Sequence, residues 1–330
     1  MKKLMGLIFT IIFATLLCVC TYAKTSNNFS LNLYENGKYY LHYSQYLDNE
    51  NAIQIPEEYL SICKGDNCFY LIKDIEDETQ ANELYSCDNN LQNIKFVTYL
   101  PQDIDTITYY NNSLYFTKNI YTDNGHYTEL CSINLDTKKQ TKYITYSGNL
   151  LLAGVNNDYL IYYINSLYDY GFKLYKQNIN NKLDKDILLS SKSYVMFQLL
   201  GEKNIYIKNI NNLIGTGNLI SIDINTGKLL NTYNLDYHYT PLCEYNGYLY
   251  ISYKNKIYKA LENNSLSLIS ENNDIPLQYT FCSSLNNECA LISYDVKREY
   301  EVIYIYNIKT NEWKYIGKFT YPDDDEYTDC

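Results

Sequence analysis

The sequence predicts an all-β fold, a β-propeller built from four-stranded antiparallel blades, on two observations. First, a short apolar strand rich in tyrosine returns along the chain at a nearly constant interval. Ile72 and Ile292 hold the same place in the first and last of six such strands, 220 positions and five steps apart, so the repeat averages 44 residues. Second, tyrosine makes up 41 of the 330 residues, glycine only 13 and proline only 5, a composition that favours strands.

A second strand follows the first in each repeat and keeps the same interval, for example at Leu84-Tyr85, Leu174-Tyr175 and Ile303-Tyr304. Turns rich in Asn, Asp or Gly, such as Asn246-Gly247 and Asn225-Thr226-Gly227, precede the first strand and follow the second. These residues tolerate the left-handed backbone that tight hairpins need. Because a further strand follows the second turn, each repeat holds four strands. Four strands every ~40–50 residues are typical of a propeller blade.

The number of blades follows from the length of the repeat. Residues 24–330 number 307, which at 44 residues for each repeat gives about seven blades, the first one short. Six blades with an N-terminal hairpin is the alternative. A β-sandwich has no reason to repeat six times, and a solenoid of hairpins would leave apolar ends exposed. We predict one domain over 24–330, ending in an acidic tail at 320–330, with blades starting near 29, 59, 106, 150, 195, 239 and 278.

The first 23 residues have the pattern of a secretory signal peptide. Lys2 and Lys3 precede an apolar run over 4–19, and Thr21-Tyr22-Ala23 has small residues at its first and third places. We therefore expect cleavage after Ala23 and an exported protein, secreted, on the cell surface or in the periplasm. An uncleaved or lipidated membrane anchor is the alternative, and only in that case do we expect contact with a membrane.

Eight cysteines follow this segment, and an even number in an exported chain favours disulfides. Cys63 and Cys68 enclose a four-residue turn, and Cys282 and Cys289 occupy the equivalent part of a later repeat, so we predict one bridge within each pair. Zinc is disfavoured because neither CxxC pairs nor histidines lie nearby. The sequence leaves open the pairing of the other four, which are Cys87, Cys131, Cys243 and Cys330.

Charge and motifs exclude several functions. The net charge of −11 argues against a nucleic-acid partner, which needs a basic protein face. Arg298 is the only arginine, so only one side chain can recognise a phosphate or carboxylate in the bidentate way that is typical of arginine. No GxSxG, HExxH, phosphate-binding glycine loop or EF-hand loop occurs. We expect no cofactor and no metal, apart from a weak surface Ca²⁺ site at the carboxylate runs of 74–78 and 323–326.

A propeller separates its loops onto two faces. The connections between the first and second strands and between the third and fourth strands are tight here and share one face, the tight-turn face. Longer connections open on the other, the long-loop face, and long loops on a rigid scaffold commonly carry binding residues. Exposed tyrosines there suit sugar rings or protein partners, although a tyrosine-rich chain exposes many by composition alone. The candidates are Tyr121, Asp123, His126, Tyr127, Tyr168, Tyr170, His238, Asp295 and Arg298.

Several of these strands resemble the bacterial exported propellers related to the YWTD propellers of lipoprotein receptors. Leu114-Tyr115-Phe116-Thr117-Lys118 stands where that family has its Tyr-Trp-Thr-Asp tetrad, and Asn246-Gly247-Tyr248-Leu249-Tyr250 is the closest stretch. The resemblance covers about residues 59–319, but no repeat has the complete tetrad and the only tryptophan, Trp313, lies in a different strand. The resemblance implies a ligand-binding propeller outside the cytoplasm, usually without catalysis.

From these observations we predict an exported, monomeric, non-catalytic binding propeller that recognises a protein or a glycan through its long-loop face. One alternative is a glycosidase or lyase with carboxylates in the central pocket, since glycoside cleavage needs two carboxylates at a suitable separation. The other alternative is a structural module of a cell-envelope assembly.

Overall fold

The computed structural model describes residues 32–33, 39–41, 46–47, 52–56, 58–59, 61–73, 75, 81–123, 125–166, 171–192, 195–210, 216–236, 239–275, 280–285, 288–295 and 300–320. Throughout these ranges the regular elements are β-strands, which confirms the predicted all-β class. None of these residues lies in a helix long and apolar enough to span a membrane. The predicted signal segment, the tail beyond Thr320 and most of the two carboxylate runs lie outside the described ranges.

The described strands form six antiparallel blades, each of four consecutive strands in sequence order; five blades are four-stranded sheets, and the sixth belongs to a five-stranded sheet. Their strands are β5 (Ser61–Lys64), β6 (Phe69–Lys73), β7 (Asn82–Cys87) and β8 (Lys95–Leu100); β9 (Ile104–Tyr110), β10 (Ser113–Thr122), β11 (Gly125–Asn134) and β12 (Gln140–Ser147); β13 (Leu150–Asn156), β14 (Tyr159–Ser166), β15 (Gly171–Asn178) and β16 (Lys185–Ser191); β17 (Val195–Leu200), β18 (Asn204–Ile210), β19 (Thr216–Asp223) and β20 (Leu229–Asp236); β21 (Thr240–Tyr245), β22 (Tyr248–Tyr253), β23 (Lys256–Ala260) and β24 (Leu266–Glu271); β25 (Thr280–Leu285), β26 (Glu288–Asp295), β27 (Tyr300–Asn307) and β28 (Glu312–Thr320).

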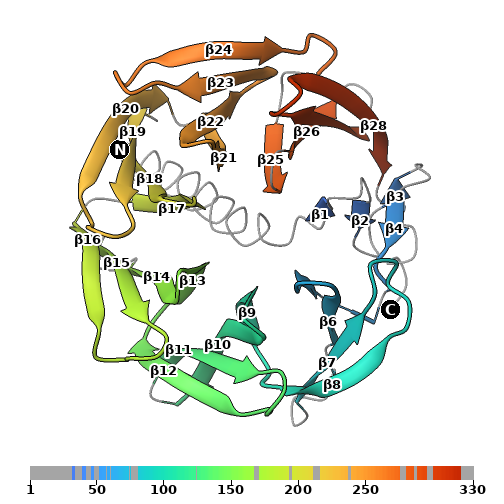
Figure 1. Ribbon diagram of the computed structural model, residues 1–330, viewed down its shortest axis with the longest axis vertical. Coiled ribbons are helices and arrows are strands. Elements are labelled where there is room, and N and C mark those ends of the chain that lie inside the picture. Colours follow the sequence, from blue (N-terminus) through green and yellow to red (C-terminus); the bar gives the residue numbers. More distant parts are fainter. Residues whose placement is uncertain are drawn as a thin grey trace, which may run out of the picture.

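The sheets stand around a common centre, with β9, β13, β17, β21 and β25 innermost and β8, β12, β16, β24 and β28 outermost (Figure 1). Neighbouring blades touch through these first strands, since β9 contacts both β5 and β13, and β21 contacts both β17 and β25. The first strands of the six blades begin at Ser61, Ile104, Leu150, Val195, Thr240 and Thr280, at intervals of 40–46 residues.

The N-terminal strands depart from the blade pattern. Strands β1 (Asn32–Leu33), β2 (Tyr39–Leu41) and β4 (Ala52–Gln54) form a three-stranded sheet in which β2 and β4 run parallel. It lies between the last blade and the blade of β5–β8 (Figure 1). Strand β3 (Tyr46–Leu47) instead pairs with β28 as a fifth strand. A short seventh antiparallel blade is thus not confirmed: Leu41 and Ile72 are only 31 positions apart, too few for a complete repeat of 44.

Each pair of neighbouring blades shares an apolar cluster. The cluster between β5–β8 and β9–β12 includes the fully buried Leu84, Leu114 and Phe116, and equivalent clusters follow around the described ring. Burying one such side chain contributes about 1.5–3 kcal/mol. All six blades also carry a β-bulge between their third and fourth strands. A bulge increases local twist, which helps each flat sheet become a twisted blade.

The tight turns between third and fourth strands repeat one arrangement. The Asp223 Oδ1 atom accepts hydrogen bonds from the backbone N–H groups of Asn225 (3.0 Å) and Thr226 (2.7 Å), and Gly227 follows with a φ of +67°. Asn134, Asn178 and Asn307 act in the same way in other blades. The Ile224 N–H also donates to the Lys203 carbonyl oxygen (2.9 Å), so the two tight turns of a blade are fastened together. The Asn-rich turns of the sequence are therefore structural.

The structure does not show either predicted disulfide. Cys63 and Cys68 are thiols, and Cys63 lies opposite Tyr70 across the hairpin rather than opposite Cys68. Burial raises the pKa of the Cys63 thiol to about 12. In the later repeat, Cys289 lies opposite Ser284, two positions from Cys282, and the side chains of this pair lie outside the described residues.

Candidate functional site

Four of the predicted binding residues lie together at the end of the β10–β11 hairpin. Tyr121 is 71% exposed and stacks on the ring of His126, with ring centroids 4.9 Å apart. The Nε2 atom of His126 forms a hydrogen bond with Asn119 Oδ1 (3.1 Å). Asp123 is exposed and Tyr127 is half-buried. The hairpin end is thus an exposed aromatic surface.

The other predicted residues are not brought to this hairpin by the described part of the chain. Asp295 ends β26 opposite Tyr300, and its side chain lies outside the described residues. The remaining four predicted binding residues lie outside the described residues. They are Tyr168, Tyr170, His238 and Arg298.

A cavity of about 580 Å³ opens on the opposite, tight-turn face, between the blades of β13–β16 and β17–β20. Three turns form it: the β13–β14 and β17–β18 turns and the β19–β20 turn. Its lining residues are Val155, Asn156, Asn157, Glu202, Lys203, Asp223 and Asn225. This volume falls within the range of about 300–1,000 Å³ that is usual for small-molecule sites.

Asn156 joins the two blades at this cavity. Its Nδ2 group donates to the carbonyl oxygens of Glu202 (3.0 Å) and Gly201 (3.4 Å), which belong to the next blade. The following residue, Asn157, has a φ of +47°, a left-handed conformation that asparagine tolerates well. The asparagines that the turn requires thus also position the wall of the cavity.

Lys176 lies beside the cavity and is only 7% exposed. Its ammonium group is 3.5 Å from the Asn225 carbonyl oxygen and 4.1 Å from the ring centre of Tyr159. The pKa of Asp223 is lowered, first by the Thr226 hydroxyl and backbone N–H and then by contributions that include Lys176. Asp223 therefore stays ionised at neutral pH.

Glu244, at the end of β21, reaches under the β17–β18 turn. Its two carboxylate oxygens accept hydrogen bonds from the Asn204 backbone N–H (3.3 Å) and the Asn204 Nδ2 group (3.2 Å). Burial raises the pKa of Glu244, the backbone N–H groups of Lys203 and Asn204 oppose that rise, and the Glu202 charge adds to it. A carboxyl group with a raised pKa beside a cavity is a common feature of functional sites.

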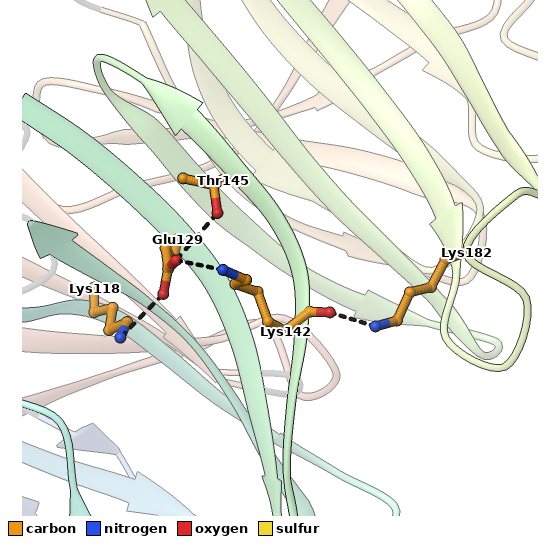
Figure 2. A network of polar contacts seen from close by, with 5 residues as sticks. All are labelled: Lys118, Glu129, Lys142, Thr145 and Lys182. Atoms are coloured by element: carbon orange, nitrogen blue, oxygen red, sulfur yellow. Dashed lines mark hydrogen bonds and ion pairs between the residues drawn. The ribbon is translucent and has the colours of Figure 1, made fainter.

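A second glutamate, Glu129, has the opposite surroundings. Its carboxylate accepts hydrogen bonds from Lys142 (2.9 Å) and Thr145 (3.1 Å) and pairs with Lys118 (3.0 Å), as Figure 2 shows. Burial tends to raise the pKa of Glu129, but these three partners outweigh it and the pKa is lowered. Lys182, from the next blade, donates to the Lys142 carbonyl oxygen. Glu129 thus remains an ionised structural group.

The cavity lining has groups that bind but no nucleophile. It offers two carboxylates, one ammonium group and three side-chain amides, with no Ser, Cys or His among the lining residues described. Within the described part of the chain, no three His, Cys, Asp or Glu side chains come together to hold a metal ion. The arrangement therefore suits the binding of a polar ligand that carries charge.

Sequence reasoning assigned no role to Glu202 and Lys203. Most other turns at this position consist of Asn, Asp or Gly, as at Asn111-Asn112 and Asn246-Gly247, whereas Gly201 is followed by a pair of opposite charges. This departure from the repeat is the feature of the sequence that could have identified Glu202 and Lys203 as candidate site residues.

No protein-family model matches the sequence, and no curated protein matches it. Solved structures do match the fold. The β-propeller domain of the trilobed protease from Pyrococcus furiosus, which has an open velcro topology, aligns over 83% of both chains with a TM-score of 0.55 and 11% identity. This chain is a β-propeller.

The fold also matches part of two larger peptidase chains. An acylaminoacyl peptidase solved with Z-Gly-Gly-Phe-chloromethyl ketone has a TM-score of 0.54 at 10% identity, over 83% of this chain and 46% of that one. A puromycin-hydrolysing peptidase of Mycobacterium tuberculosis has a TM-score of 0.52 at 10% identity, over 79% and 45%. This propeller therefore spans less than half the length of those peptidases. At these identities the likeness carries the fold alone.

The comparisons contradict the predicted function, a non-catalytic propeller that binds a protein or glycan through its long-loop face. Five of the solved structures that this chain matches, each with a TM-score above 0.5, are peptidases or a domain of a protease. The prediction was wrong because sequence repeats specify a fold and not the function that the fold carries. The resemblance to YWTD propellers, export and a monomeric state stay predictions.

Proposed function

We propose that this chain is a peptidase-associated propeller, a module that works with a peptide-hydrolysing catalytic unit. That unit is supplied by another polypeptide or by a further part of the same one. The signal-like pattern of residues 1–23 supports a location outside the cytoplasm for this work.

One observation carries the proposal: this chain and the propeller domain of the trilobed protease each align over 83% of their length, and four further peptidases, each with a TM-score above 0.5, align over 78–83% of this chain. The cavity supports it, because its described lining has charged and amide groups for holding a peptide and no nucleophile for cleaving one. In this arrangement the propeller holds or admits peptides and the partner unit hydrolyses them.

The proposal is tested by purifying the tagged full chain from the cells that produce it, under native conditions. The eluate is assayed with fluorogenic N-acylated peptides, before and after treatment with Z-Gly-Gly-Phe-chloromethyl ketone. The recombinant chain alone and an unrelated tagged protein from the same cells are the controls. We expect hydrolysis only in the native eluate, and we expect the chloromethyl ketone to abolish it.

An eluate that hydrolyses no peptide faster than the unrelated control contradicts the proposal. Hydrolysis by the pure recombinant chain also contradicts it, because the active centre would then lie in this chain. Gel analysis of the active eluate separates the two sources of the catalytic unit, since a longer form of this chain and a second polypeptide differ in size.

A further inference from the structure

The cavity between β13–β16 and β17–β20 keeps opposite charges that the fold does not use. Within the described residues, the Glu202 carboxylate and the Lys203 ammonium group accept or donate no hydrogen bond and form no ion pair, and both residues are exposed at the cavity. The Glu202 backbone, by contrast, is held by Asn156. These two charges therefore face the cavity from a fixed turn.

Further charges of both signs lie near Glu202 and Lys203. Asp223 lines the same cavity as an ionised carboxylate, and only its Oδ1 atom is used by the β19–β20 turn. Lys176 adds a positive charge behind Asn225. An anion alone would be repelled by two carboxylates, and a cation alone by two ammonium groups. A ligand that carries one charge of each sign satisfies both, because each of its ends then meets an opposite charge.

We propose that this cavity binds short peptides with free termini, with the terminal ammonium group held by Glu202 and Asp223 and the terminal carboxylate by Lys203. This inference rests on the proposed function, according to which the ligands of the propeller are peptides. It identifies the cavity as the part of the propeller that binds them. The volume of about 580 Å³ leaves room for a small molecule of this kind.

The test is calorimetric titration of the pure recombinant chain with trialanine, N-acetyl-trialanine and trialanine amide. We expect trialanine to bind, and we expect each blocked terminus to weaken binding about tenfold through loss of a charge-assisted contact. Glu202→Gln reduces the discrimination against the acetylated peptide, because Asp223 remains, whereas Lys203→Gln removes the discrimination against the amide. Glu262→Gln and Lys309→Gln are the matched controls, because both are exposed charges in turns on the same face of other blades, and they leave binding unchanged.

Two results overturn the inference: no binding of trialanine at millimolar concentration, or binding that Glu202→Gln and Lys203→Gln leave intact. Melting curves of the variants establish that each is folded, as expected for exposed residues. The titration uses the pure chain without a peptidase, so its result does not depend on hydrolysis. If trialanine binds in the titration but the native eluate hydrolyses no peptide, only the proposed function is refuted. If the native eluate hydrolyses peptides but trialanine does not bind at this cavity in the titration, only the present inference is refuted.

Discussion

Glu129 and Glu244 are both withdrawn from solvent, yet their neighbours shift the pKa of the two carboxyl groups in opposite directions. Glu129 lies within one blade between two lysines on adjacent strands, and its pKa is lowered (Figure 2). Glu244 crosses to the neighbouring blade and meets neutral amide donors of Asn204, with Glu202 nearby, and its pKa is raised.

The difference shows what offsets the cost of removing a carboxylate from water. At Glu129, cations paired at about 3 Å outweigh desolvation, whereas at Glu244 the hydrogen bonds from neutral donors offset it only in part. Glu129 in the blade interior thus stays charged, whereas the carboxyl group of Glu244, at the contact between blades, is protonated at a higher pH than an ordinary glutamate.

The largest expected effect comes from Glu129→Gln, which leaves Lys118 and Lys142 without their counter-charge. We expect a loss of about 2 kcal/mol in the free energy of unfolding, measured by urea denaturation. Lys142→Gln is the control, because its side chain is 59% exposed and an exposed ion pair contributes little to stability. Equal losses for both variants would show that the cluster is no more than a surface ion pair.

Gly201→Ala tests how closely Glu244 approaches the neighbouring blade. A Cβ atom at Gly201 would lie 2.1 Å from Glu244 Oε2 and 3.1 Å from the Asn204 carbonyl oxygen, so either the turn or Glu244 must move. We expect a loss of about 1–2 kcal/mol by thermal denaturation. Gly171→Ala has no atom within 4 Å and serves as the control, with little change. A stable Gly201→Ala variant would contradict this close contact.

The pH dependence of stability separates the two carboxyl groups by sign. The lowered pKa of Glu129 means that its stabilisation is present above the ordinary value near 4.5 and is lost as pH falls through the folded pKa. The raised pKa of Glu244 means that its contribution is present below 4.5 and is lost as pH rises through the folded pKa.

Unfolding curves of the wild type, Glu129→Gln and Glu244→Gln between pH 3 and pH 8 follow both effects. The deficit of Glu129→Gln shrinks toward acid pH. Glu244→Gln, which mimics the protonated acid, gains on the wild type as pH rises. If both differences change in the same direction, the contrast between the two regions is wrong.

The smallest effect is expected at a hydrogen bond between blades. Tyr110 donates from its hydroxyl to Asp158 Oδ1 (3.1 Å) in the next blade, at an exposed position. Tyr110→Phe should lower the free energy of unfolding by about 0.5 kcal/mol. Tyr121→Phe, at the 71% exposed hairpin tip, should leave it unchanged. A larger loss for Tyr121→Phe would mean that the hairpin end takes part in the fold.

The repeat made the blades predictable, because each strand pairs with the next one in sequence and its tight turn is encoded locally by residues such as Asp223 and Gly227. The cavity was not predictable in this way. Asn156 and Glu202 meet across 46 positions of sequence, and their contact depends on how two blades pack. The expectation that binding residues lie in long loops led to the prediction of Tyr121 and His126. The cavity instead lies among short turns, where the sequence pattern of Asn residues reflects the backbone conformation of the turn.

The most direct measurement of where this propeller binds its ligand is hydrogen–deuterium exchange of the full chain with and without saturating trialanine. We expect slower exchange at residues 155–158, 201–204 and 223–227, the three turns around the cavity, and no change at residues 119–128 of the β10–β11 hairpin. Protection at the hairpin with unchanged turns would contradict the account and return the binding site to the long-loop face.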